Sequence, residues 1–202
     1  MTFESLKVLA VFLVSIASLV TLLVADWRVT IGLLAVQFAG VFLLIGLEWP
    51  IASAITILIA GWLSGAILGM AVVSIPRNSP SAEDRILSSQ RLNPLFNFLA
   101  AVLIYLLVVT LAPQVQKWLP LLGAEQSLAA LTLIGLGMLR LALDASPLST
   151  AAALLAVISG FEVIYATLTT AQFAVGALAV ITLCIALTGA YLLLSPSMEE
   201  TS

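Results

Sequence analysis

Apolar runs long enough to cross a lipid bilayer follow one another along nearly the whole sequence. A helix needs about 20 predominantly apolar residues to span roughly 30 Å of hydrocarbon. Hydrophobic residues make up 62% of the chain and charged residues only 8%, so no soluble domain remains. We predict an all-α integral membrane protein in which residues 1–202 form a single polytopic membrane domain. Its seven expected spans are residues 8–25, 29–47, 51–75, 94–112, 127–142, 148–168 and 172–194.

The polar segments between these runs indicate how the chain is oriented. Trp27, Trp49 and Trp118 fall at span ends, where aromatic side chains commonly lie at a membrane interface. With seven spans, all the arginines lie on one side of the membrane and both lysines on the other. The positive-inside rule then predicts an outside N-terminus, a cytoplasmic C-terminus and a cytoplasmic loop at residues 76–93. We expect a bacterial plasma membrane or a thylakoid membrane.

Composition also restricts the chemistry of this chain. It has no histidine and one cysteine, whereas His-ligated haem, iron–sulfur clusters and most zinc sites need several such ligands. We therefore expect no cofactor, no metal site and no catalytic residue, so the chain is not an enzyme on its own. Its few basic residues do not form a nucleic-acid surface, and its expected partners are the lipid bilayer and other membrane subunits.

A weak internal symmetry surrounds the fourth span. Spans one to three and five to seven have the same predicted direction. Each set has an arginine at its first inner turn, Arg28 or Arg140, followed further along by Glu48 or Glu162. The pattern is compatible with two parallel three-helix repeats around a central helix.

The third span contains a helix-packing motif. Gly61, Gly65 and Gly69 recur every four residues and so lie on one face of the helix. Because bare glycines let two backbones approach closely, we expect this face to contact another helix.

Four polar residues are candidates for an ion path. Glu162 lies close to the middle of the sixth span, where a carboxylate marks either an ion or proton path or a structural role. Gln37, near the middle of the second span, is expected to form an interhelical hydrogen bond or to orient water beside a titrating group. Glu48 is either a member of the path or an ordinary interfacial residue. Arg140 either pairs with Asp144, if the helix continues, or extends toward the interface.

The start of the second span resembles a known family. Arg28, Gly32, Ala35 and Gln37, read as R-x3-G-x2-A-x-Q, resemble component E, a small membrane protein of hydrogenase-4 and formate-hydrogenlyase complexes. A third span that ends in PRNSP and about 200 residues in seven spans agree with this. The C-terminal part of that family resembles the K subunit of complex I and the C subunit of multisubunit cation/proton antiporters. The resemblance implies a small membrane-arm subunit beside large antiporter-like chains.

The chain departs from that family where charged residues would form a relay. Ser64 and glycines occupy the third span, where the family tends to carry a lysine. After Arg140 the chain has Ser149 and Thr150 where relatives place a glutamate, and Glu162 follows about three turns later. Our leading hypothesis is a non-catalytic, mainly structural subunit of a proton- or cation-translocating complex, with a contribution to an ion path. A stand-alone small transporter or channel, and a membrane assembly factor or scaffold, are the alternatives.

Overall fold

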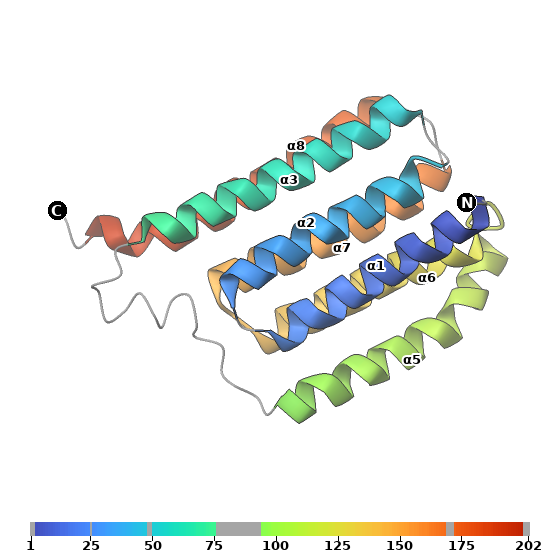
Figure 1. Cartoon of the computed structure of the whole chain (residues 1–202), viewed down its shortest axis with the longest axis horizontal. Coiled ribbons are helices and arrows are strands. Elements are labelled where there is room, and N and C mark those ends of the chain that lie inside the picture. The colour runs from blue at the N-terminus through green and yellow to red at the C-terminus, as the bar shows by residue number, and fades with distance from the viewer. Residues whose placement is uncertain (1–2, 25, 48–49, 76–93, 169–171, 200–202) are drawn as a thin grey trace.

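The computed structural model describes residues 3–24, 26–47, 50–75, 94–168 and 172–199. These residues form only helices and their connections, and seven of the helices are long and apolar enough to cross a membrane. The predicted all-α membrane class is confirmed within this part of the chain (Figure 1). The helices are α1 (Phe3–Leu23), α2 (Trp27–Ile45), α3 (Ile51–Ser74), α5 (Pro94–Trp118), α6 (Ala124–Leu143), α7 (Pro147–Leu168) and α8 (Gln172–Glu199).

Local sequence signals explain where several helices begin. The Asp26 side chain accepts a 2.9 Å hydrogen bond from the backbone N–H of Arg28 and so caps α2. Helices α5 and α7 begin with Pro94 and Pro147, because proline suits a first helical position, where its missing N–H is no loss. At the start of α6, the side chain of Gln126 accepts a 3.0 Å hydrogen bond from the N–H of Gly123.

The fourth span is longer than the sequence predicted. We expected residues 94–112, ending before Pro113, whereas α5 continues through that proline to Trp118. A proline inside a helix removes one backbone hydrogen bond, but helices that cross membranes tolerate it when neighbouring groups compensate. The predicted boundary was therefore wrong, because the helix-breaking tendency of Pro113 did not end the helix.

Six helices form two stacked layers (Figure 1). Helices α1, α2 and α3 lie side by side in one layer, and α6, α7 and α8 lie behind them in the same order. The stacked neighbours are α1 with α6, α2 with α7 and α3 with α8, and both members of each pair run in the same direction. This arrangement agrees with two parallel three-helix units. Helix α5, central in the chain order, lies at the edge of the bundle, where it packs against α6 and contacts α1.

Glycines occur at several of the helix contacts. Between α1 and α2, a Cβ at Gly40 would lie 3.3 Å from the carbonyl oxygen of Ala10. Between α6 and α7, a Cβ at Gly160 would lie 2.8 Å from the carbonyl oxygen of Ala130, and one at Gly137 would lie 3.0 Å from that of Ala153. Because lipid tails are as apolar as leucine, close van der Waals packing rather than hydrophobic burial holds such helices together.

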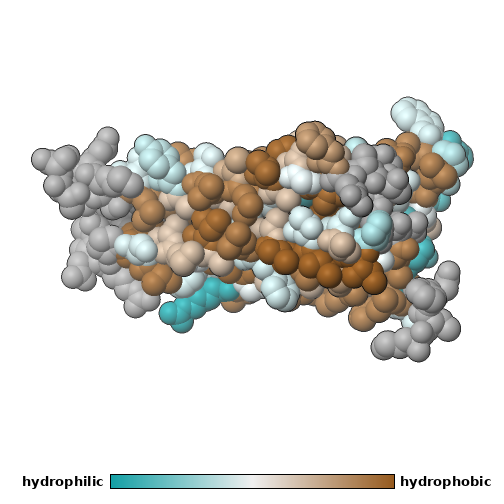
Figure 2. All heavy atoms as spheres, turned by 90° about the horizontal axis from the view of Figure 1, so that it is seen from above, coloured by the Kyte–Doolittle hydropathy of each residue, from teal (hydrophilic) through white to brown (hydrophobic). Residues whose placement is uncertain are grey.

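The outer surface of the bundle is apolar. Large hydrophobic side chains are exposed on all the helices, including Phe12 on α1, Ile59 on α3 and Leu103 on α5. In the face seen in Figure 2, hydrophobic residues cover the middle, and most of the strongly hydrophilic ones lie toward the two ends. Such a surface suits hydrocarbon rather than water. The chain is therefore a multi-pass integral membrane protein.

Candidate functional site

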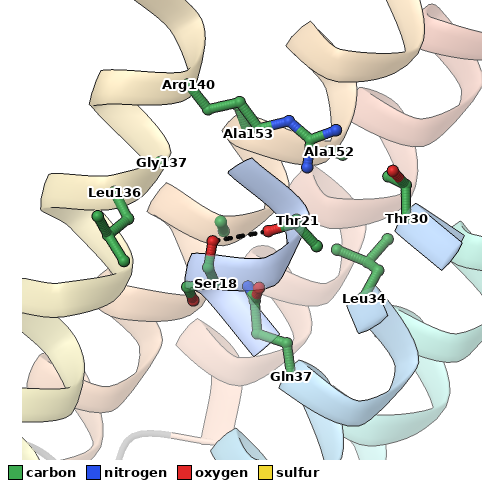
Figure 3. A pocket seen from close by; sticks show the side chains of 11 residues that line it. Ser18, Thr21, Thr30, Leu34, Gln37, Leu136, Gly137, Arg140, Ala152 and Ala153 are labelled. Atoms are coloured by element: carbon green, nitrogen blue, oxygen red, sulfur yellow. Dashed lines mark hydrogen bonds between the residues drawn. The ribbon is translucent and has the colours of Figure 1, made fainter. Parts of the chain in front are cut away.

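A small polar pocket lies inside the bundle, between the two layers (Figure 3). It is located toward the end at which α1 and α6 finish and α2 and α7 begin. The space at its centre is about 10 Å³, which is room for about one water molecule. Gln37 and Arg140, two of the candidates from the sequence, meet here. The lining residues are Ser18 and Thr21 of α1, Thr30, Leu34 and Gln37 of α2, Leu136, Gly137 and Arg140 of α6, and Ala152, Ala153 and Ala156 of α7.

Arg140 bonds across the helix contact rather than along its own helix. Its Nε donates a 2.7 Å hydrogen bond to the hydroxyl of Ser149 on α7. The predicted pairing with Asp144 required a longer helix, but α6 ends at Leu143, and Asp144 Oδ1 accepts from the backbone N–H of Ser146. The alternative, an arginine that extends toward the interface, stays a prediction, since the half-buried side chain lines a pocket near the end of the bundle. Asp144 still attracts the guanidinium electrostatically.

Gln37 lies where the sequence placed it, but it does not form the expected interhelical bond. Its side chain is only 2% exposed, and its Nε2 has no hydrogen-bonding partner among the described residues. The side chain points into the pocket toward Ser18 (Figure 3), whose hydroxyl oxygen is likewise buried without a partner. Buried polar groups are normally paired, so two unpaired ones on the same cavity indicate an occupant that supplies hydrogen bonds.

Glu162 is buried on α7, where it faces α8. It is 1% exposed, and its Oε1 accepts a long 3.4 Å hydrogen bond from the Thr182 hydroxyl. That hydroxyl also donates to the carbonyl oxygen of Leu178 at 2.9 Å, so it is shared between two acceptors. The other carboxyl oxygen, Oε2, has no partner in the described part of the chain. A third helix contributes Ser64, whose hydroxyl lies 3.4 Å from the carbonyl oxygen of Thr182.

Glu162 and Gln37 lie at similar depths in the bundle. Helices α2 and α7 run in parallel and pack against each other. Gln37 lies eight residues before Ile45, the end of α2, and Glu162 lies six residues before Leu168, the end of α7. At 1.5 Å per residue these offsets are about 12 Å and about 9 Å. Counted from these ends, the two residues differ in depth by only about 3 Å.

The remaining sequence candidates have different outcomes. Glu48 lies outside the described residues. On α3, the positions of Gly61, Gly65 and Gly69 face side chains of α2. At Gly61 the neighbour is the ring of Phe38, which a Cβ would overlap.

The two arginines of the proposed repeats occupy unlike surroundings. Arg28 is exposed at the start of α2, and its guanidinium lies 5.3 Å from the centre of the Trp27 ring. Arg140, in contrast, belongs to α6 and lines the pocket between four helices. The similarity of their positions in the sequence therefore does not extend to their environments.

Sequence reasoning missed the small hydroxyl residues of the site. Ser18, Thr21, Thr30 and Thr182 come from separate apolar runs and follow no motif. Hydroxyl side chains in membrane helices often bond their own backbone, as Thr21 does to the carbonyl oxygen of Ser18. The residues that line the pocket come together only because α1 packs against α6 and α2 against α7. The sequence alone does not show which helices pack together.

The chemistry available here is hydrogen bonding and charge compensation. Among the described residues, no group of three His, Cys, Asp or Glu side chains could hold a metal ion. The fold and the site thus define a multi-pass helical membrane protein with an internal polar pocket and a separate buried carboxylate. A comparison of the chain with protein-family models, with curated proteins and with solved structures found no match.

Proposed function

We propose that this chain is a non-catalytic subunit in the membrane arm of a proton- or cation-translocating complex of the hydrogenase-4 or complex I type. In this role it packs beside large antiporter-like chains and contributes Glu162 to an ion path. The observation that carries the proposal is the burial of this carboxylate inside a membrane bundle with one oxygen unpartnered. Maintaining a charge there costs several kcal/mol unless a cation or hydrogen-bond donors accompany it, so such residues mark ion paths by default.

The partners in this proposal come from the sequence pattern of α2. Arg28, Gly32, Ala35 and Gln37 are the residues that resemble component E of hydrogenase-4, and the last of them lines the polar pocket. The apolar outer surface supports contact with lipid or with the helices of larger subunits. Purification from native membranes in mild detergent should recover this chain together with a large antiporter-like subunit. Recovery of the chain alone would contradict the proposal.

The role of Glu162 is tested by Glu162→Gln in the intact complex. Glutamine is nearly isosteric and still accepts a hydrogen bond from Thr182, but it cannot exchange a proton or neutralise a cation. We expect ion translocation by inverted membrane vesicles to fall about tenfold or more, as expected when a group that moves the ion is removed, while assembly of the complex stays unchanged.

Glu125→Gln is the matched control, because this carboxylate lies in the first turn of α6 at the end of the bundle. The complex that carries Glu125→Gln should translocate ions at the wild-type rate. A Glu162→Gln complex that translocates ions at the wild-type rate would rule out a path through this residue.

A stand-alone transporter is the second candidate, and one observation favours it. The polar pocket is enclosed by α1, α2, α6 and α7 of one chain, so a substrate site would not need a partner. Proteoliposomes that contain only this protein distinguish the two functions. Vesicles without uptake or leak are the outcome expected of an accessory subunit, whereas ion flux abolished by Glu162→Gln would favour the transporter.

A further inference from the structure

The side chains around the internal pocket include several that can donate hydrogen bonds and no acid. The lining contains the guanidinium of Arg140, the amide of Gln37 and three hydroxyl residues, and its other members are apolar. Asp144 attracts the guanidinium but is not part of the lining, and its Oδ1 accepts from the N–H of Ser146. The lining itself therefore carries one positive charge and no negative one.

Two buried polar groups of the described residues line the pocket without a hydrogen bond. Gln37 Nε2 and Ser18 Oγ have no hydrogen-bonding partner in the described residues, although their side chains are only 2% and 5% exposed. In the orientation that the structure has, Gln37 presents its amide nitrogen, which donates, so a partner that fits it is an acceptor. Gln37 and Arg140 approach the pocket from opposite sides (Figure 3), and the acceptor would lie between them.

Helix ends of both kinds lie beside the pocket. Helices α2 and α7 begin at this end of the bundle, and Thr30 and Ala152, from the first two turns of these helices, line the pocket. The N-terminal end of a helix carries a partial positive charge, which favours anions, whereas the C-terminal ends of α1 and α6, which also finish here, carry the opposite charge. No acid lies in the lining beside Arg140, so an anion in the pocket would add to the attraction that Asp144 already provides.

We propose that this pocket binds one small monovalent anion of about the size of a water molecule, such as chloride. The charge of the lining favours an anion over a water molecule. The central space of about 10 Å³ suits a monatomic ion better than a polyatomic anion such as sulfate or a lipid phosphate. The site is formed by one chain, so it does not depend on the proposed membrane complex.

Thermal unfolding of the full chain in detergent tests this proposal, with tryptophan fluorescence as the signal. Raising chloride from 1 to 100 mM at constant ionic strength, with gluconate as the replacement, should raise the unfolding midpoint by on the order of 5 °C. Sulfate should give no such rise. Equal midpoints in chloride and gluconate would overturn the proposal, because the pocket would then hold only water.

Variants locate the effect in the pocket. Gln37→Leu removes the unpaired donor with little change of volume, and Ser18→Ala is the milder second variant. Each should weaken the response to chloride about tenfold or more, because each removes about one hydrogen bond to a charged group. The control variants are Gln114→Leu and Arg28→Met, which change an exposed amide and an exposed arginine outside the pocket. Both should retain the wild-type response to chloride. A chloride response retained by both pocket variants would show that the anion binds elsewhere. Anomalous scattering from bromide at the pocket would provide independent support.

Discussion

Replacing Gly160 by leucine is expected to separate α6 from α7 and to leave little correctly folded protein. A Cβ at this position would lie 2.8 Å from the carbonyl oxygen of Ala130 and 2.7 Å from the side chain of Ile134. The side chain of Ile134 can rotate, but the carbonyl belongs to the helix backbone and cannot move without displacing α6. We expect a loss of about 3 kcal/mol or more in the free energy of unfolding, at the upper end of overpacking effects.

The measurement is unfolding of the detergent-solubilised protein by SDS, followed by circular dichroism, together with the fraction eluting as a single species. Gly176→Leu is the matched control, because a Cβ at Gly176 has no neighbour within 4 Å. This control should match the wild type or be slightly more stable, since leucine favours helix more than glycine does. Equal loss of stability in both variants would show that any leucine at a membrane glycine is harmful and that the α6–α7 contact is not special.

Replacing Gly61 by leucine should be strongly destabilising as well, and a second substitution should rescue it. The ring of the fully buried Phe38 on α2 occupies the space that a Cβ at position 61 of α3 would enter. Phe38→Ala alone removes that ring and should cost about 3–5 kcal/mol, because it leaves a cavity. In the double variant the new leucine fills part of the cavity. We therefore expect the double variant to be more stable than either single one.

A double-mutant cycle measures this compensation. The four proteins are unfolded in the same detergent, and the coupling between positions 38 and 61 should be about 2 kcal/mol or more in the stabilising direction. Gly65→Leu combined with Phe38→Ala is the control, because a Cβ at Gly65 would touch Ile31 and Leu34 rather than Phe38. Additive losses in the first pair would mean that α2 and α3 do not pack through the ring of Phe38.

Much of the fold is predictable from sequence because lipid imposes a strict length on each helix. The predicted spans and the helices agree within a few residues at most ends, and the clearest disagreement, after Pro113, arises where tertiary context overrides a local signal. The packing face of Gly61, Gly65 and Gly69 was also predictable, since four-residue spacing fixes one side of a helix. The partner helix of that face was not, because spacing carries no information about neighbours.

The candidate site was only partly predictable. Burial of Glu162 followed from its place within an apolar run, and this is the strongest agreement at a single residue. The surroundings of Arg140 could not be predicted, because Ser149 becomes its partner only when α6 and α7 pack together. The position of Ser18 beside Gln37 could not be predicted either, because the two residues lie on different helices. Contacts between distant helices depend on the stacking order of the layers, and no periodic pattern records that order.

The stacking of the two layers limits how such units can assemble. Because α1, α2 and α3 face α6, α7 and α8 in the same order and direction, the layers are related by a displacement. A two-fold axis between the layers would instead either place α1 against α8 or make the stacked helices antiparallel. In a displaced arrangement the two surfaces that form the contact are different. If separate protein copies associate head to tail in this way, further copies can add to the assembly without limit. Because both layers belong to one polypeptide, this contact forms within the chain and needs no association of separate copies.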